Sequence, residues 1–284
     1  KQEPMIHRTY LTMALASSLA LATTSSCIIA VGNDRSVMTP KASSEAMSPT
    51  LGGKLYTSAW IQRSAEYKAL CHQAYNIATE RLLAATARGG HRWAIVTDID
   101  ETIVDNSANS VHQALKGEDF TQASWDKWCD QASAIALAGA VDFFRKADSL
   151  GVQIFYISNR DEANRAGTLR NLRSLGLPQA DDQHLMLRDA SRNSDKTARR
   201  NAVLKQYEIL MLLGDNLGDF DHVFDSKQEQ TREAAVAKLA REFGRRFIVL
   251  PNPNYGTWEP AMNGGYLPLK ERDKKLPQLL RSHP

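Results

Sequence analysis

Residues 93–106 read WAIVTDIDETIVDN, and this stretch decides the fold that we expect for the chain. It begins with a short apolar run at 94–96, which is typical of a strand buried on both faces of a sheet. The eight residues that follow Thr97 carry four acids: Asp98, Asp100, Glu101 and Asp105. Ionised carboxylates this close repel one another, so the stretch needs a cation or a shared proton. Open α/β sheets place their ligands at such strand ends, so we expect the functional site there.

Strand-like and helix-like segments alternate along the second half of the chain. Apolar runs that predict buried strands recur at 152–157, 184–187, 208–213 and 247–250. Helices are expected before and between them, at 139–150, 161–175, 197–205 and 232–243. Strands separated by helices predict an α/β fold with a doubly wound parallel sheet and right-handed crossovers.

The segments on either side of the first strand are expected to form a mainly helical cap. Apolar residues at helical spacing predict one long helix over residues 57–87. Residues 107–120 are polar and predict an irregular segment, after which Ser124 is expected to cap a helix. We therefore expect one domain over 55–284, with a cap built from about 55–90 and 107–138 and a core from about 91–106 and 139–260.

The first 27 residues are expected to be a signal peptide. Arg8 precedes an apolar stretch at 11–23 that is too short to span a bilayer. Small residues then lead to Cys27, which resembles the lipidated cysteine of a bacterial lipoprotein cleavage site; ordinary signal-peptide cleavage nearby is the alternative. We expect export, as an outer-membrane lipoprotein or into the periplasm of a Gram-negative bacterium. Residues 28–54 are then expected to form a flexible tether.

The charge of the chain bears on the partners that we expect, and its cysteines bear on disulfide bonding. The formal net charge is +3, without a basic stripe that carries interleaved aromatic residues, so we expect no nucleic-acid partner. Cys71 and Cys129 can pair in an oxidising compartment. Each lies in a segment with helical spacing, where a lone cysteine usually serves as a small buried hydrophobe, and we favour that interpretation.

Polar signals stand at the ends of strands or helices in four places: Asp98-x-Asp100-x-Thr102, Ser158-Asn159-Arg160, Lys196 and Gly214-Asp215-Asn216-Leu217-Gly218-Asp219. Because parallel strands end at one edge of a sheet, we expect these side chains to meet in one crevice. Asp98, Asp100 and Asp215 offer the oxygen ligands that Mg²⁺ prefers. The cation would neutralise the acids and screen an incoming phosphate, while Ser158 and Lys196 would contact the phosphoryl oxygens.

In this order the signals resemble the haloacid dehalogenase superfamily of phosphohydrolases. Within it the chain is similar to the bacterial class C acid phosphatases, lipoproteins with four signature aspartates. The likeness is carried by the Trp125/Trp128 segment and by AEYKALCHQAYNIA (65–78), TDIDETIVDNS (97–107), ISNR (157–160), GDNLGDF (214–220) and FIVLPNPNYGTWE (247–259), and it covers about residues 55–260. It implies a Mg²⁺-dependent acid phosphatase that hydrolyses phosphomonoesters such as 5′-nucleotides and aryl phosphates.

The resemblance also implies a role for each matching residue. Asp98 would be the nucleophile that forms an aspartyl-phosphate, and Asp100 would be the general acid and then the general base. Mg²⁺ would bind the side chains of Asp98 and Asp215 and the backbone carbonyl of Asp100. Three further residues would support the site: Asp219, which would orient the metal site or Lys196, and Thr102 and Asn159.

Trp125 and Tyr255 are the candidates for stacking on a nucleoside base. Aromatic residues dominate protein cores, so core packing is the alternative for both. The remaining acids of the two loops are expected to be solvated: Glu101, Asp105 and Asp119.

Two other functions are compatible with parts of this pattern. A signalling receiver domain also places a phosphorylated aspartate at a strand end, with a divalent cation and a lysine nearby. Asp100, two residues beyond Asp98, argues against it because an acid there turns the phosphate over. A non-catalytic binding lipoprotein on the same scaffold is disfavoured because every motif position is present.

Overall fold

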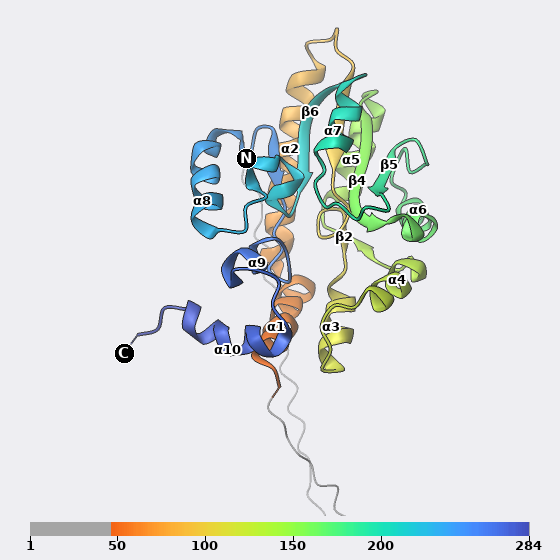
Figure 1. Ribbon diagram of the computed structural model, residues 1–284. Helices are drawn as coiled ribbons and strands as arrows, with labels where there is room; N and C mark the ends of the chain where they lie inside the picture. The colour runs from red at the N-terminus through yellow and green to blue at the C-terminus, as the bar shows by residue number, and fades with distance from the viewer. Residues whose placement is uncertain (1–46, 284) are drawn as a thin grey trace, which may run out of the picture. The chain divides into compact units, whose positions relative to one another are not determined.

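The core of the protein is a five-stranded parallel sheet with strand order β5-β4-β1-β6-β7. The computed structural model describes residues 47–283 (Figure 1). The strands are β1 (Trp93–Thr97), β4 (Gln153–Asp161), β5 (Leu185–Arg188), β6 (Glu208–Gly214) and β7 (Phe247–Val249). The doubly wound α/β fold predicted from the sequence is thus confirmed, and β1, the strand that the four acids follow, is central.

Helices cover both faces of this sheet. The helices α2 (Ala65–Thr86), α5 (Ala140–Ser149) and α6 (Arg165–Ser174) pack on one face, and α7 (Thr197–Leu204) and α8 (Glu229–Lys238) pack on the other. The central strand shows why its sequence is apolar throughout: Ile95 is buried in the first layer, whereas Ala94 and Val96 are buried in the second.

The cap lies beyond the carboxyl ends of the strands (Figure 1). It contains α1 (Pro49–Arg63), α3 (Ser107–Leu115) and α4 (Gln122–Gln131). The short strands β2 (Val104–Asp105) and β3 (Ile135–Ala136) pair antiparallel and bring the two ends of the α3–α4 insertion together.

The prediction of an irregular segment at 107–120 was wrong, because the first nine residues of this segment form α3. The segment has few large apolar groups, so its sequence pattern is weak. Gln113 and Ala114 are nevertheless buried, and the helix packs against α1. Tertiary contact here overrides local propensity. The predicted cap of the following helix is also displaced: Thr121, not Ser124, accepts the hydrogen bond at the start of α4.

The single helix predicted over 57–87 is two helices, interrupted at Ser64. Its hydroxyl accepts a hydrogen bond from the Tyr67 amide and begins α2. The first helix, α1, begins at Pro49, so the last residues of the predicted 28–54 tether are helical. Ser48 caps α1 and, with the Thr50 amide, binds Asp273 of α10 (Leu269–Leu279). This contact across the chain has no local sequence signal.

The predicted cap also included α2, which instead covers the sheet beside α5. Its apolar side chains at 71, 74, 78 and 82 are buried in the same layer as the strands. The helix predicted over 232–243 is α8 followed by a 3-10 turn, Ala240–Glu242. The chain ends with α9 (Trp258–Asn263) and α10.

Cys71 and Cys129 are free and buried, as favoured from the sequence. In the stretch 47–283 no helix has both the length and the hydropathy needed to cross a bilayer. The predicted signal peptide, Cys27 and most of the tether lie outside the described residues.

Candidate active site

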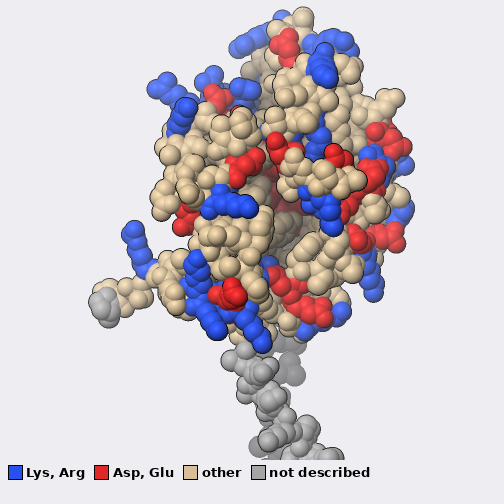
Figure 2. Space-filling model, viewed as in Figure 1, with Lys and Arg blue, Asp and Glu red and all other residues tan. Residues whose placement is uncertain are grey.

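The four polar signals meet at the carboxyl end of the sheet. Asp98 directly follows β1, Ser158 lies in the last part of β4 and Asp215 directly follows β6. Lys196 directly precedes α7 and points back to β1. In the view of Figure 2, acidic side chains gather around a hollow between this edge and the cap. The convergence predicted from strand order is therefore present.

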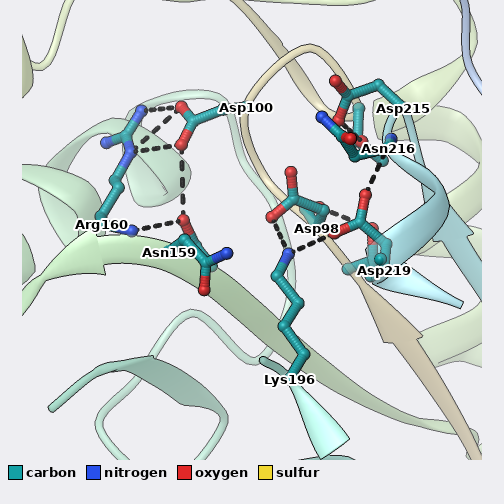
Figure 3. Close-up of polar contacts among 12 residues, drawn as sticks. Asp98, Asp100, Asn159, Arg160, Lys196, Asp215, Asn216 and Asp219 are labelled. Carbon is teal, nitrogen blue, oxygen red and sulfur yellow. Dashed lines mark hydrogen bonds and ion pairs between the residues drawn. The ribbon is translucent and has the colours of Figure 1, made fainter. Parts of the chain in front are cut away.

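The first group of side chains is the aspartate cluster, which we define as Asp98, Asp215, Asp219 and Lys196. The Lys196 Nζ atom lies 2.5 Å from Asp98 Oδ1 and 2.6 Å from Asp219 Oδ1 (Figure 3). Carboxylate oxygens of the three aspartates lie within 4.8 Å of one another. Lys196, Asp98 and Asp219 are buried.

Burial and mutual repulsion dominate the electrostatics of the aspartate cluster. Burial raises the pKa of Asp98 to about 7, and the charges of Asp219 and Asp100 act in the same direction against Lys196. Burial and the neighbouring carboxylates of Asp219 and Asp98 also hold the pKa of Asp215 well above its usual range. One lysine therefore faces three carboxylates, and the excess negative charge in an all-oxygen donor set fits a hard divalent cation.

Neighbouring groups fix the orientation of two of these carboxylates. Asn252 donates its side-chain amide to Asp215 Oδ2 at 2.8 Å, and Thr102 donates to Asp215 Oδ1 at 3.3 Å. Asp219 Oδ2 accepts the Asn216 backbone amide at 2.9 Å. A Cβ atom at Gly214 would overlap the Asp219 carboxylate, so glycine is required at the end of β6. Hydrogen bonds from neighbouring groups to carboxylates of this kind set which oxygens face a metal.

The second group is the Asp100 cluster, which we define as Asp100, Arg160, Asn106 and Ser158. The side chain of Asp100 turns away from the aspartate cluster toward Arg160, whose Nη2 lies 2.6 Å from Asp100 Oδ1 (Figure 3). Asn106 Nδ2 donates to the same oxygen at 2.9 Å, and Ser158 Oγ donates to Oδ2 at 3.4 Å. Of the three aspartates predicted to bind metal, only Asp98 and Asp215 bring their carboxylates together; Asp219 stands beside them.

Arg160 was expected in the crevice without an assigned role, and Asn252 was not singled out from the sequence. Both lie inside blocks that carried the resemblance, ISNR and FIVLPNPNYGTWE, so a signal was present but no role was read from it. Their partners, Asp100 and Asp215, lie 60 and 37 residues away in the chain. Chain spacing alone does not show such pairings.

The prediction that Glu101 is solvated was wrong, because its side chain is buried. Its side chain is 1% exposed, and its carboxylate accepts hydrogen bonds from the Asn106 amide at 2.8 Å and from Asn106 Nδ2 at 3.2 Å. Burial, with the charges of Asp100 and Asp215, raises its pKa well above the usual range. The turn after β1 folds inward, with positive φ (53°) at Glu101, and this points the side chain into the protein.

Asp119 is likewise not a solvated loop residue. Its carboxylate pairs with Lys54 of α1, at 2.8 Å, and with Arg272 of α10. The third loop acid, Asp105, is half-buried and accepts the Ser107 amide at 2.7 Å at the start of α3. All three acids thus hold the loops that surround the site.

The remaining predicted residues line the two clusters or lie close to them. Asn159 donates to the Ser194 carbonyl at 3.0 Å and accepts from Arg199 at 2.6 Å, which ties the end of β4 to the segment before Lys196. The Arg160 guanidinium lies 5.5 Å from the centre of the half-buried Trp125 ring. The Tyr255 hydroxyl is buried and has no hydrogen-bond partner among residues 47–283.

The chain belongs to the acid phosphatases of the HAD (haloacid dehalogenase) superfamily, subfamily IIIB, whose family model matches residues 16–258. The class C acid phosphatase resemblance and the enzyme class, a phosphoric monoester hydrolase, are confirmed by this match and by the structures below.

Two solved structures of the class C acid phosphatase from Bacillus anthracis are similar to the chain, each at 36% identity. One has a TM-score of 0.78 and covers 83% of this chain and 100% of the bacterial chain. The other, with tungstate bound, has a TM-score of 0.79 and covers 84% and 100%. Acid phosphatase 1 of Solanum lycopersicum is 26% identical over 167 residues, 56% of this chain and 57% of the tomato protein. The chain thus matches little more than half the length of that relative.

Proposed function

We propose that the chain hydrolyses phosphomonoesters through a phosphorylated Asp98, with Mg²⁺ as its metal. The observation that carries the proposal is the Lys196 ammonium between Asp98 and Asp219, with Asp215 beside them. It supplies a buried nucleophile, a fixed positive charge for a phosphoryl group and an acidic pocket for a cation.

In the first step an oxygen of Asp98 attacks phosphorus, and the bond from phosphorus to the leaving oxygen breaks. The carboxylic acid of Asp100 gives its proton to that oxygen, so an alcohol leaves and Asp100 becomes a carboxylate. The Lys196 ammonium and the Ser158 hydroxyl face the phosphoryl oxygens and stabilise the charge that develops there.

In the second step a water molecule attacks the phosphorus of the aspartyl-phosphate. Asp100 accepts a proton from this water, and the bond between phosphorus and Asp98 breaks. Phosphate leaves, Asp98 is again a carboxylate and Asp100 is again protonated. An acid two residues beyond the nucleophile distinguishes this cycle from the long-lived phosphate of a receiver domain.

Asp98 and Asp215 would hold Mg²⁺ with their side chains and Asp100 with its backbone carbonyl. Bound there, the ion supplies Lewis-acid stabilisation of phosphoryl charge and offsets the excess negative charge of the aspartate cluster. Asp219 pairs with the Lys196 ammonium and so keeps it beside Asp98.

We propose small phosphomonoesters as substrates, namely 5′-nucleotides and aryl phosphates, with Trp125 and Tyr255 as the base-stacking candidates. The cap over the strand ends supports this size class, and tungstate, bound to the Bacillus anthracis relative, is an oxyanion with the charge and geometry of phosphate. Export, a lipidated Cys27 and an outer-membrane or periplasmic location remain proposals from the sequence.

The test measures phosphate release from a nucleoside 5′-monophosphate with Mg²⁺ and after treatment with EDTA. We expect EDTA to abolish turnover, Mg²⁺ to restore it, and acid-quenched enzyme to carry phosphate on Asp98 in a peptide mass spectrum. Unchanged turnover in EDTA would contradict the metal role. Phosphate that stays on Asp98 for many minutes in native enzyme would instead favour a receiver-like phosphoacceptor.

A further inference from the structure

The contacts of Arg160 concentrate on one carboxylate, that of Asp100. Its Nη2 atom lies 2.6 Å from Asp100 Oδ1, and its Nε atom lies 3.1 Å from both carboxylate oxygens. We propose that Arg160 is a positioning residue that orients the Asp100 carboxyl group for proton transfer to the leaving group. This inference rests on the proposed function, in which Asp100 is the general acid.

The hydrogen bonds on Asp100 are unevenly divided between its two oxygens. Oδ1 accepts from Arg160 Nη2, Arg160 Nε and, at 2.9 Å, Asn106 Nδ2. Oδ2 accepts two contacts: one from Arg160 Nε, which is shared with Oδ1 and lies 3.1 Å from each oxygen, and one from Ser158 Oγ at 3.4 Å. Oδ1 is therefore occupied by donors, and Oδ2 is the oxygen that can carry the transferable proton. It also lies beside Ser158, the group that faces the phosphoryl oxygens in the proposed mechanism.

Arg160 is itself held rigidly. Its side chain is 2% exposed, and its Nη1 atom donates to Thr168 Oγ1 of α6 at 3.0 Å. The Trp125 ring of α4 lies against the guanidinium, and the Arg160 amide donates to Ser158 Oγ at 3.1 Å. The planar fork of arginine can fix a carboxylate in one orientation, which the single ammonium of a lysine cannot do.

A purely structural ion pair would make the same contacts, so the test must separate orientation from stability. Proton transfer matters most when the leaving oxygen is a poor leaving group, as in the ribose alkoxide of a nucleoside 5′-monophosphate. It matters little for 4-nitrophenolate, which departs without protonation. A misplaced acid therefore slows the first substrate selectively, whereas a loss of folded protein slows both equally.

The experiment compares kcat/KM for a nucleoside 5′-monophosphate and for 4-nitrophenyl phosphate in Arg160→Lys, with Mg²⁺ present. We expect a loss of about 100-fold for the nucleotide, within the range that general acid catalysis contributes, and a much smaller loss for the aryl phosphate. Because kcat/KM covers the steps up to the first irreversible one, it reports substrate binding and formation of the aspartyl-phosphate and excludes the later hydrolysis of that intermediate. Equal losses on the two substrates would overturn the inference.

Two further variants keep the comparison decisive. Arg232→Met removes another buried arginine, which donates to the Phe224 carbonyl away from the site, and should leave the ratio of the two kcat/KM values unchanged. If Arg160→Lys does not fold, Thr168→Val removes the support of the guanidinium and should shift the ratio in the same direction by a smaller factor. Wild-type enzyme without metal-dependent turnover would overturn the proposed function and this inference together. Metal-dependent wild-type turnover with an unchanged ratio in Arg160→Lys, or in Thr168→Val where Arg160→Lys does not fold, would overturn the inference alone.

Discussion

The aspartate cluster and the Asp100 cluster lie side by side at the strand ends but differ in charge balance. In the aspartate cluster, one ammonium faces three carboxylates, and burial with repulsion raises the pKa of Asp98 and Asp215. In the Asp100 cluster, one carboxylate faces one guanidinium. The difference separates two tasks. Excess negative charge prepares the first cluster for a cation, whereas a matched pair in the second fixes the direction of one carboxyl group.

The largest effect is expected on turnover, when each cluster loses one carboxylate. Asp98→Asn should lower kcat by at least about 10⁴-fold on every substrate, because it removes the nucleophile. Asp100→Asn should lower kcat/KM for a nucleotide by about 10²–10⁴-fold and spare aryl phosphates in part, because it removes the acid. Both are measured by phosphate release. Wild-type turnover of Asp98→Asn would show that another group attacks phosphorus.

The same two variants should differ in stability in the metal-free protein. Asp100→Asn leaves the buried Arg160 without its carboxylate and should lower the free energy of unfolding by about 3 kcal/mol. Asp98→Asn removes a repelled carboxylate while Lys196 keeps Asp219, so it should not destabilise at pH 7. Denaturant unfolding in EDTA measures both. Equal destabilisation by the two substitutions would contradict the difference in charge balance.

The smallest effect is expected in the pH dependence of stability of the metal-free protein. The pKa of Asp98 is raised to about 7 in the folded state and is about 4 in the unfolded state, so only the folded state holds this proton between those values. This contribution to stability is complete below about pH 4 and is lost as the pH rises through about 7.

Thermal unfolding of wild type and Asp98→Asn in EDTA isolates this contribution. The melting temperatures should agree near pH 4, and the variant should melt about 5 °C higher at pH 7. Mg²⁺ should remove the wild-type deficit, since a cation favours the ionised carboxylates. A difference that stays constant with pH would show that Asp98 does not titrate in this range.

Most of the sheet could be predicted because buried parallel strands have a strong local signature. Residues 94–96, 152–157 and 208–213 are mainly apolar runs, interrupted only by Gln153 and Glu208, with polar groups after their carboxyl ends, and β1, β4 and β6 lie there. The helix α3 could not be predicted in this way, since its buried residues, Ser107, Gln113 and Ala114, are polar or small and give no apolar pattern, although the folded chain packs α3 against α1.

The candidate site, like the fold, could be predicted from the sequence only in part. The sequence by itself determined that Asp98, Ser158 and Asp215 lie at or near the carboxyl ends of their strands, and parallel order brings such ends to one edge of a sheet. Only the tertiary structure decided which charges face each other: Lys196 reaches Asp98 across 98 residues of chain, and Arg160 reaches Asp100 across 60. Strand ends follow from local apolar patterns. The partner of a buried charge depends on how far its side chain reaches and which neighbour desolvates it, and these exist only in the folded chain.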